Sequence, residues 1–231
     1  MRLDLILQHA DLFFDGLMMT LKLTAMSLAI GMLIALPVAV LRLQRIPVLD
    51  GFLRGYIFVF RGTPMLVQTY LVYYGLVQFE FVRDSVLWPL VRSPFNCALI
   101  AFSLNTAAYT AEILRGALEA TPKGEIEAAR SIGMSSWQVL RRITIPGAFR
   151  RALPQYGNEV ILMLHGSTVA SVITIQDILG AGRTLNGKYY LAYEGLVTAA
   201  LLYLALTLLI AGAFGLAGQK WQAHLRPAQT H

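Results

Sequence analysis

The sequence has 231 residues, of which 56% are hydrophobic and 14% are charged, and its formal net charge is +6. Soluble domains carry about 25% charged residues, so this composition and the mean hydropathy of +0.59 indicate a membrane protein. The single cysteine, Cys97, excludes an internal disulfide and a metal site built from cysteines.

Five stretches are apolar and long enough to cross a bilayer, which takes about 20 residues. In chain order they are residues 17–41, 55–78, 95–114, 157–175 and 193–217. The first is not a signal peptide, because its N-terminal flank is acidic and its C-terminal flank is basic. We therefore expect an all-α polytopic membrane protein with five transmembrane helices. No polar linker divides the chain, so residues 1–231 are expected to form one transmembrane domain.

Lysine and arginine residues gather after the first, third and fifth predicted spans. The positive-inside rule then predicts an N-terminus outside, a C-terminus in the cytoplasm, and a cytoplasmic segment at 121–146. The net charge is mostly explained by this topology. A nucleic-acid partner is not expected, since it would require a basic face with stacking aromatics on a soluble module.

The second predicted span is interrupted soon after it begins by Arg61, Gly62, Thr63 and Pro64. Free backbone groups and a charge at membrane depth are tolerated inside a bundle or beside a cavity. These four residues are predicted to lie at a cavity or at a subunit interface. An ordinary packing kink is the alternative.

The segment 121–146 is too polar to span the membrane and is patterned as two short helices. Gly133 can adopt the positive φ that ends the first helix. Ser135 or Ser136 can cap the second, which Pro146 is expected to end.

The second of these helices is expected to turn Trp137 inward, which leaves a knob with an apolar ridge and charged flanks. Such a knob suits docking into a groove on a partner protein. An amphipathic helix lying on the lipid surface fits the pattern equally well.

The same segment carries a spaced motif. Its residues are Glu127, Ala128, Ala129, Gly133, Ile143 and Pro146. They resemble the E-A-A-x3-G-x9-I-x-L-P motif of the permeases of ABC importers, with Ile145 in place of the usual leucine. The stretches 60–64, 108–117 and 153–159 resemble the branch of that family that takes up polar amino acids.

The resemblance implies a type I ABC importer permease in a bacterial inner membrane, with the N-terminus in the periplasm. The motif residues would couple the chain to a dimer of separate ATPase subunits, which drives alternating access. Further implied partners are a second, non-identical permease subunit and a periplasmic amino-acid-binding protein. The implied substrates are basic amino acids (histidine, arginine, lysine, ornithine) or related opines.

No nucleotide site is expected in the chain itself. Residues 182–188 fit G-x4-G-K but lack the Ser/Thr that would hold Mg²⁺, and they lie in a predicted outside segment. ATP and Mg²⁺ are therefore assigned to the partner ATPase. No catalytic residue, metal site or cofactor is expected, and the chain is not expected to be an enzyme.

Ionisable and polar residues within the spans are the candidates for substrate contact. The predicted pathway residues are Gln68, Asn105, Tyr109, Glu159, Met163, His165 and Thr168. The Glu159 carboxylate could meet the ammonium or guanidinium of a basic amino acid, or could instead bond to a span terminus. The other polar groups could instead hydrogen-bond between helices. Glu112 and Arg115 are predicted to be a structural or interfacial ion pair, since they lie three residues apart.

Relatives that bind basic amino acids often carry Lys-Asp-Ser where this chain has His165-Gly166-Ser167. This chain has Gly166 in place of that aspartate and so lacks a second acidic group in addition to Glu159. The main anionic pocket is therefore expected in the paired permease. An ion-coupled secondary amino-acid carrier is the alternative from another class. Such a carrier would be expected to contain an internal repeat of its spans. Five spans do not divide into two equal halves, which argues against this alternative.

Overall fold

The computed structural model describes residues 3–86 and 88–222, and this part of the chain is all-helical, with no strand. The longer helices are α2 (Ala10–Leu43), α3 (Pro47–Gly62), α7 (Pro94–Glu119), α10 (Ile145–Gly166), α11 (Ile178–Tyr189) and α12 (Glu194–Gln222). The short α-helices are α1 (Leu3–Gln8), α4 (Met65–Tyr70), α5 (Glu80–Arg83), α6 (Trp88–Val91), α8 (Lys123–Ser131) and α9 (Ser136–Val139). There are also π-helical turns, η1 (Leu71–Gly75) and η3 (Leu140–Thr144), and 3-10 turns, η2 (Leu76–Gln78) and η4 (Ser167–Ile173).

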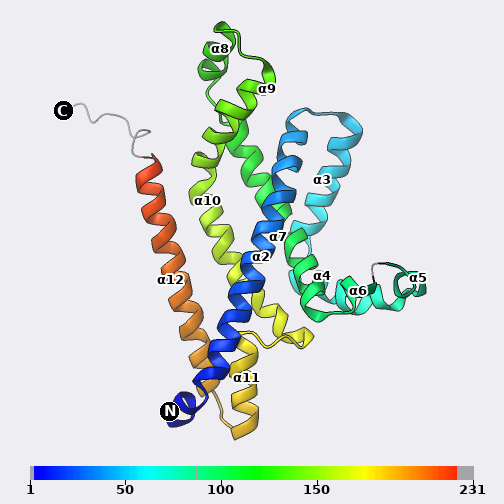
Figure 1. Ribbon diagram of the computed structural model, residues 1–231, viewed down its shortest axis with the longest axis vertical. Helices are drawn as coiled ribbons and strands as arrows, with labels where there is room; N and C mark the ends of the chain where they lie inside the picture. Colours follow the sequence, from blue (N-terminus) through cyan, green and yellow to red (C-terminus); the bar gives the residue numbers. More distant parts are fainter. Residues whose placement is uncertain (1–2, 87, 223–231) are drawn as a thin grey trace, which may run out of the picture.

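The helices form an elongated bundle around α2 and α7, which pack against each other along much of their length (Figure 1). Helix α10 lies against α7, and α12 forms one edge of the bundle. Helices α8 and α9 lie at one end of the long axis, with α1 and α11 at the other. The segment from α4 to α6 projects to the side.

Helices α2, α7 and α12 are each long and apolar enough to cross a membrane, by length and composition. They coincide with the first, third and fifth predicted spans. The segments Ser136–Ile173 and Ile178–Tyr189 meet at 45° and give a fourth candidate if together they form one bent span. Among the described residues this criterion thus finds three or four spans.

The second predicted span, 55–78, is not one helix. Helix α3 ends at Gly62, and Thr63 and Pro64 are extended, with ψ of 146° and 135°, before α4 begins. The proline ring clashes with a helical conformation at the residue before it, which explains the break. The interruption predicted at this position is therefore confirmed.

The helix that contains the fourth predicted span, 157–175, begins well before that span, since it runs from Ser136 through η3 and α10. The prediction that Pro146 ends a helix is wrong. Pro146 lies in the first turn of α10, just after the π-helical turn η3, where a missing N–H does little harm. Pro154 lies inside α10. Helix α10 packs against α7 and α12.

Small residues set the spacing of the central helices. Gly31 of α2 faces α7 so closely that a Cβ added to it would lie 2.4 Å from Cγ2 of Thr106. Ala98, Ala101, Ala107, Ala108 and Ala111 of α7 are fully buried. Close backbone approach through small side chains is the usual way in which helices associate in lipid.

Candidate functional site

The helix break at Thr63 and Pro64 borders a cavity of 560 Å³. The cavity is lined by Arg61, Gly62, Thr63, Pro64, Met65, Leu66, Asn105, Tyr109, Glu159, Leu162, Met163, Gly166 and Val169. These residues come from α3, α4, α7, α10 and η4, so the site is assembled from distant parts of the chain.

Two buried amides hold the broken backbone. Gln68 Nε2 donates to the carbonyl oxygens of Phe60 (2.8 Å) and Thr63 (3.0 Å) and to Thr63 Oγ1 (2.8 Å). Asn105 Nδ2 donates to the Phe60 carbonyl (3.1 Å) and to Gln68 Oε1 (2.9 Å). The amides of Gln68 and Asn105 donate to backbone carbonyls that the helix break leaves without a helical partner. In this structure the two side chains therefore fix the shape of the cavity wall.

Two opposite charges line this cavity. The Glu159 side chain is buried, and its Oε1 accepts a 2.7 Å hydrogen bond from Thr106 Oγ1. Arg61 is exposed, and its guanidinium lies 5.1 Å from the centre of the Tyr109 ring. The Tyr109 hydroxyl also donates to the Arg61 carbonyl (3.4 Å). Arg61 thus lies over an aromatic face and lines the same cavity as a buried carboxylate, an arrangement that can receive both ends of a zwitterion.

Four of the predicted pathway residues line the cavity: Asn105, Tyr109, Glu159 and Met163. Gln68 is not a lining residue, but it accepts a hydrogen bond from Asn105. His165 and Thr168 are not among the lining residues of the cavity. The His165 ring instead lies 2.9 Å from Thr207 Oγ1 of α12, and Thr168 Oγ1 donates to the His165 carbonyl (2.8 Å). The apolar lining residues Leu66, Leu162 and Val169 were not predicted. Their sequence context resembles that of any lipid-facing residue, so no local signal marks them.

A second cavity of 510 Å³ adjoins the first and shares Arg61, Gly62 and Tyr109 with it. Its other lining residues include Arg42, Arg54 and Glu112.

Charged groups from three helices are linked beside this second cavity. The predicted pair of Glu112 and Arg115 is present at 3.0 Å, and Glu112 also pairs with Arg42 of α2. Arg42 bonds in turn to Asp50 (3.2 Å), which pairs with Arg54 (2.5 Å). The Arg54 hydrogen bond holds the pKa of Asp50 below its ordinary value. Glu112 therefore joins α7 to α2, which the spacing along α7 alone does not reveal.

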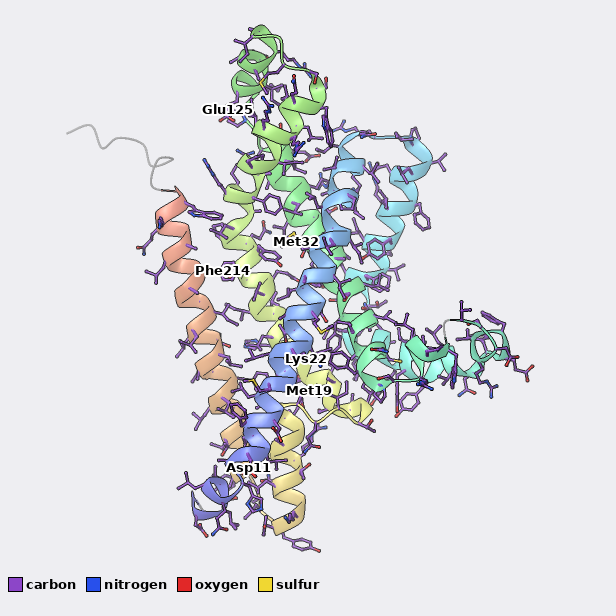
Figure 2. All side chains as sticks on the ribbon, viewed as in Figure 1. Asp11, Met19, Lys22, Met32, Glu125 and Phe214 are labelled. Carbon is purple, nitrogen blue, oxygen red and sulfur yellow. The ribbon has the colours of Figure 1, made fainter. Side chains whose placement is uncertain are left out.

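The knob consists of α8, α9 and the turn between them, at the end of the molecule where Glu125 is labelled (Figure 2). Gly133 has φ of +82°, and the N–H of Met134 donates to the carbonyl of Ala129 (3.2 Å). This bond satisfies a terminal carbonyl of α8 in the manner of a Schellman motif. Ser135 and Gln138 form a reciprocal capping box that begins α9. Both predicted helix boundaries in the knob are thus confirmed.

The outer surface of the knob carries two large apolar side chains among charged and polar ones. Ile132 is 80% exposed and Trp137 is 64% exposed, whereas Ala129 and Val139 are buried. The expectation that Trp137 points inward is wrong, because the knob is too small to cover an indole ring. Glu127 and Ala128 are exposed as well, so the motif presents side chains to an outside surface.

Arg151 connects the base of the knob to the membrane helices. Its Nε donates to the Ala117 carbonyl (3.0 Å) and its Nη2 to Thr121 Oγ1 (2.6 Å). Thr121 in turn donates to the carbonyl of Leu118 (2.8 Å). A cation at the C-terminal end of α7 is favoured by the helix dipole. The start of α10 and the end of α7 therefore meet just below the knob.

A long helical bundle with an exposed knob at one end and a cavity at a broken helix is the arrangement expected of a membrane transport subunit. The model for the family of binding-protein-dependent transport system inner membrane components matches residues 23–222, so the chain belongs to this family.

Two relatives and one solved structure illustrate the similarity. The octopine transport system permease protein OccM of Rhizobium radiobacter is 47% identical over 202 residues, covering 87% of this chain and 82% of OccM. The histidine/lysine/arginine/ornithine transport system permease protein HisM of Escherichia coli K12 is 39% identical over 219 residues, covering 94% and 92%. A crystal structure of an amino acid ABC transporter with histidines superposes with a TM-score of 0.82 at 34% identity, over 93% of this chain and 96% of that one. The chain is therefore a permease subunit with the fold of ABC importer permeases.

Proposed function

We propose that this permease carries basic amino acids or related opines across the inner membrane through the cavity beside the α3–α4 break. The observation that carries the proposal is the placement of Arg61 and Glu159 on one cavity. The guanidinium suits a substrate carboxylate, and the buried carboxylate suits an ammonium or guanidinium group. The names of OccM and HisM, which are transport proteins for octopine and for histidine, lysine, arginine and ornithine, support this substrate class.

The proposed topology has five spans. In addition to α2, α7 and α12, residues 55–78 would form the second span, from within α3 to η2, and residues 157–175 the fourth, from within α10 to just past η4. The N-terminus would be periplasmic and the C-terminus cytoplasmic, as the lysine and arginine residues of the knob and of the segments that flank it support. The test is labelling of single cysteines in a Cys97→Ser background with a membrane-impermeant maleimide. Glu80→Cys should react in intact cells, and Lys123→Cys only after lysis.

The proposed role of the knob is to receive the closing movement of an ATPase dimer, which uses ATP and Mg²⁺. Exposed Ile132 and Trp137 fit an apolar groove, with Glu127 beside them. Since the proposed substrate cavity lies elsewhere, the knob would transmit movement without selecting the substrate.

A second permease subunit, non-identical to this one, would cover the open side of the two cavities. Helix α3 exposes Phe52 (74%) and Phe58 (79%), and the following segment exposes Leu71 (63%). The set of partners is completed by a periplasmic amino-acid-binding protein. Affinity purification of the tagged chain from its native operon, followed by subunit identification, tests this composition.

The deciding experiment compares uptake by the assembled transporter with wild-type chain, Glu159→Gln and Glu159→Asp. Loss of uptake in Glu159→Gln, with assembly and basal ATP hydrolysis intact and partial activity in Glu159→Asp, would support a substrate contact. Full uptake by Glu159→Gln would refute it for this subunit and move the anionic pocket to the paired permease. Uptake without any ATPase would instead favour a secondary carrier.

A further inference from the structure

A groove of 520 Å³ lies between the first turns of α10 and the last turns of α12. It is lined by Pro146, Phe149, Arg150, Lys220 and Trp221. Two cationic side chains therefore share one groove with two aromatic rings. The groove shares no lining residue with the substrate cavity, and of the motif residues only Pro146 lines it.

The groove exists because the two helices diverge. At Gly157 they are in close contact, since a Cβ added there would lie 2.8 Å from the ring of Phe214. The rings of Tyr156 and Phe214 are 6.3 Å apart, and Phe214 points toward α10 (Figure 2). Toward the knob, α12 leans away from α10, and the space between them opens (Figure 1).

We propose that this groove binds the headgroup of an anionic phospholipid. Arg150 and Lys220 would pair with the phosphate, because charge-assisted hydrogen bonds to phosphate are the strongest contacts that these side chains make. Trp221 is 50% exposed beside them, and indole rings concentrate at the level of lipid headgroups. Basic pockets between membrane helices are a known form of anionic-lipid site.

The surroundings of the groove favour a lipid over a free phosphate or an acidic protein segment. Leu216 lies one turn before Lys220 on α12 and is 71% exposed, and Leu209 is 70% exposed two turns further back. These side chains continue the groove as an apolar track along which acyl chains can lie. A free phosphate would leave this track and the Phe149 and Trp221 rings unused. The site faces the cytoplasmic leaflet if the proposed topology holds, but binding does not depend on that orientation.

The test uses the full chain in phosphatidylcholine nanodiscs that contain spin-labelled phosphatidylglycerol. Electron spin resonance measures the fraction of label immobilised by the protein, relative to spin-labelled phosphatidylcholine. The variant Arg150→Gln/Lys220→Gln should lower the preference for phosphatidylglycerol about tenfold, since each juxtamembrane cation contributes substantially to anionic-lipid binding. The matched control, Arg83→Gln/Arg92→Gln, removes two charges elsewhere and should leave the preference unchanged.

Each outcome decides the proposal. Restored preference in Arg150→Lys/Lys220→Arg, with unchanged circular dichroism in all variants, would support a local site. An equal loss of phosphatidylglycerol preference in the control variant would show that only the net charge matters and would overturn the proposal. Displacement of the label by millimolar inorganic phosphate, but not by sulfate at equal ionic strength, would assign the groove to free phosphate. Weaker ATPase binding by Arg150→Gln/Lys220→Gln in pure phosphatidylcholine, with unchanged lipid preference, would assign it to the partner protein.

Discussion

The hydroxyl of Thr106 on α7 donates a 2.7 Å hydrogen bond to the buried carboxylate of Glu159 on α10. The same Thr106 packs its methyl group against Gly31 of α2. One threonine therefore links the tight packing of α2 and α7 to the one carboxylate that lines the larger cavity among the described residues. Glu159 is positioned by its neighbours rather than free to rotate, as expected of a group that must meet a substrate repeatedly in one geometry.

Replacement of Thr106 tests this link. Thr106→Val keeps the shape but leaves the carboxylate without its donor, which costs about 0.5–2 kcal/mol for a hydrogen bond between membrane helices. We expect a higher KM for uptake, by about threefold to tenfold, if that energy acts on substrate binding. Thr106→Ser keeps the hydroxyl and should stay within about twofold of wild type. Equal kinetics for Thr106→Val and wild type would contradict the positioning role.

Two glycines on α11 provide a matched test of close packing. A Cβ on Gly182 would lie 2.5 Å from the carbonyl oxygen of Gly195 on α12, whereas Gly187 has nothing within 4 Å. Gly182→Ala should destabilise the purified protein by about 1–3 kcal/mol through overpacking. Gly187→Ala should raise stability by about 0.5–1 kcal/mol, because alanine loses less backbone entropy in a helix. Thermal unfolding in one detergent measures both, and a lower midpoint for Gly187→Ala than for Gly182→Ala would refute the assignment.

The turn of the knob depends on a backbone that few residues adopt. At φ of +82°, any residue with a Cβ is strained at position 133, by about 1–2 kcal/mol. We expect Gly133→Ala to loosen α8 from α9 and to reduce ATPase co-purification severalfold. Gly133→Asn should be milder, since asparagine tolerates left-handed conformations. Gly124→Ala, which meets nothing within 4 Å, is the control and should retain the ATPase.

The ionic contacts between α2 and α3 predict a dependence of stability on pH. The folded-state pKa of Asp50 lies below its ordinary value of 3.8, owing first to the hydrogen bond from Arg54. A lowered pKa means that the carboxylate stabilises the fold above 3.8 and loses this effect as the pH falls through the folded-state pKa. Asp50→Asn should thus be less stable than wild type at neutral pH, and the difference should shrink in acid. Thermal unfolding over a pH series measures it, and a constant difference would show that the charge of Asp50 is not the cause.

The sequence is informative wherever a local rule governs the structure. Pro64 breaks the second predicted span, and the glycine and serine of the knob set its helix ends, because steric and capping preferences act within a few residues. The long apolar stretches likewise coincide with α2, α7 and α12.

The neighbouring helices determine which face of a helix points into the cavity. The sequence predicts this orientation less well than it predicts the helix ends. Met163 lines the cavity while His165 contacts Thr207 of α12, because two residues along a helix differ by about 200°. Nothing local in the sequence says which of the two faces inward. Neighbouring helices also explain why the helix continues from α9 through η3 into α10 past Pro146. The π-helical turn η3 accommodates the proline, and the contacts of α10 with other helices outweigh the tendency of proline to end a helix.

Arg151 offers a test of how the knob communicates with the membrane helices. Its guanidinium bonds to the Ala117 carbonyl and to Thr121, so it ties the start of α10 to the end of α7 beneath the knob. Arg151→Gln keeps part of the polarity but cannot make both bonds with the same geometry. We expect the ATPase to bind normally while ATP hydrolysis stimulated by the binding protein falls about tenfold, since loss of a charged hydrogen bond costs about 1.5–3 kcal/mol.

The neighbouring Arg150→Gln removes the same charge without touching these two bonds and is the control for coupling. In membranes of phosphatidylcholine alone it should retain stimulated hydrolysis. Loss of ATPase binding in Arg151→Gln would indicate that the arginine shapes the docking surface itself. Equal stimulation in both variants would show that movement passes from the knob to the spans without the Arg151 bridge, through the continuous backbone of η3 and α10 alone.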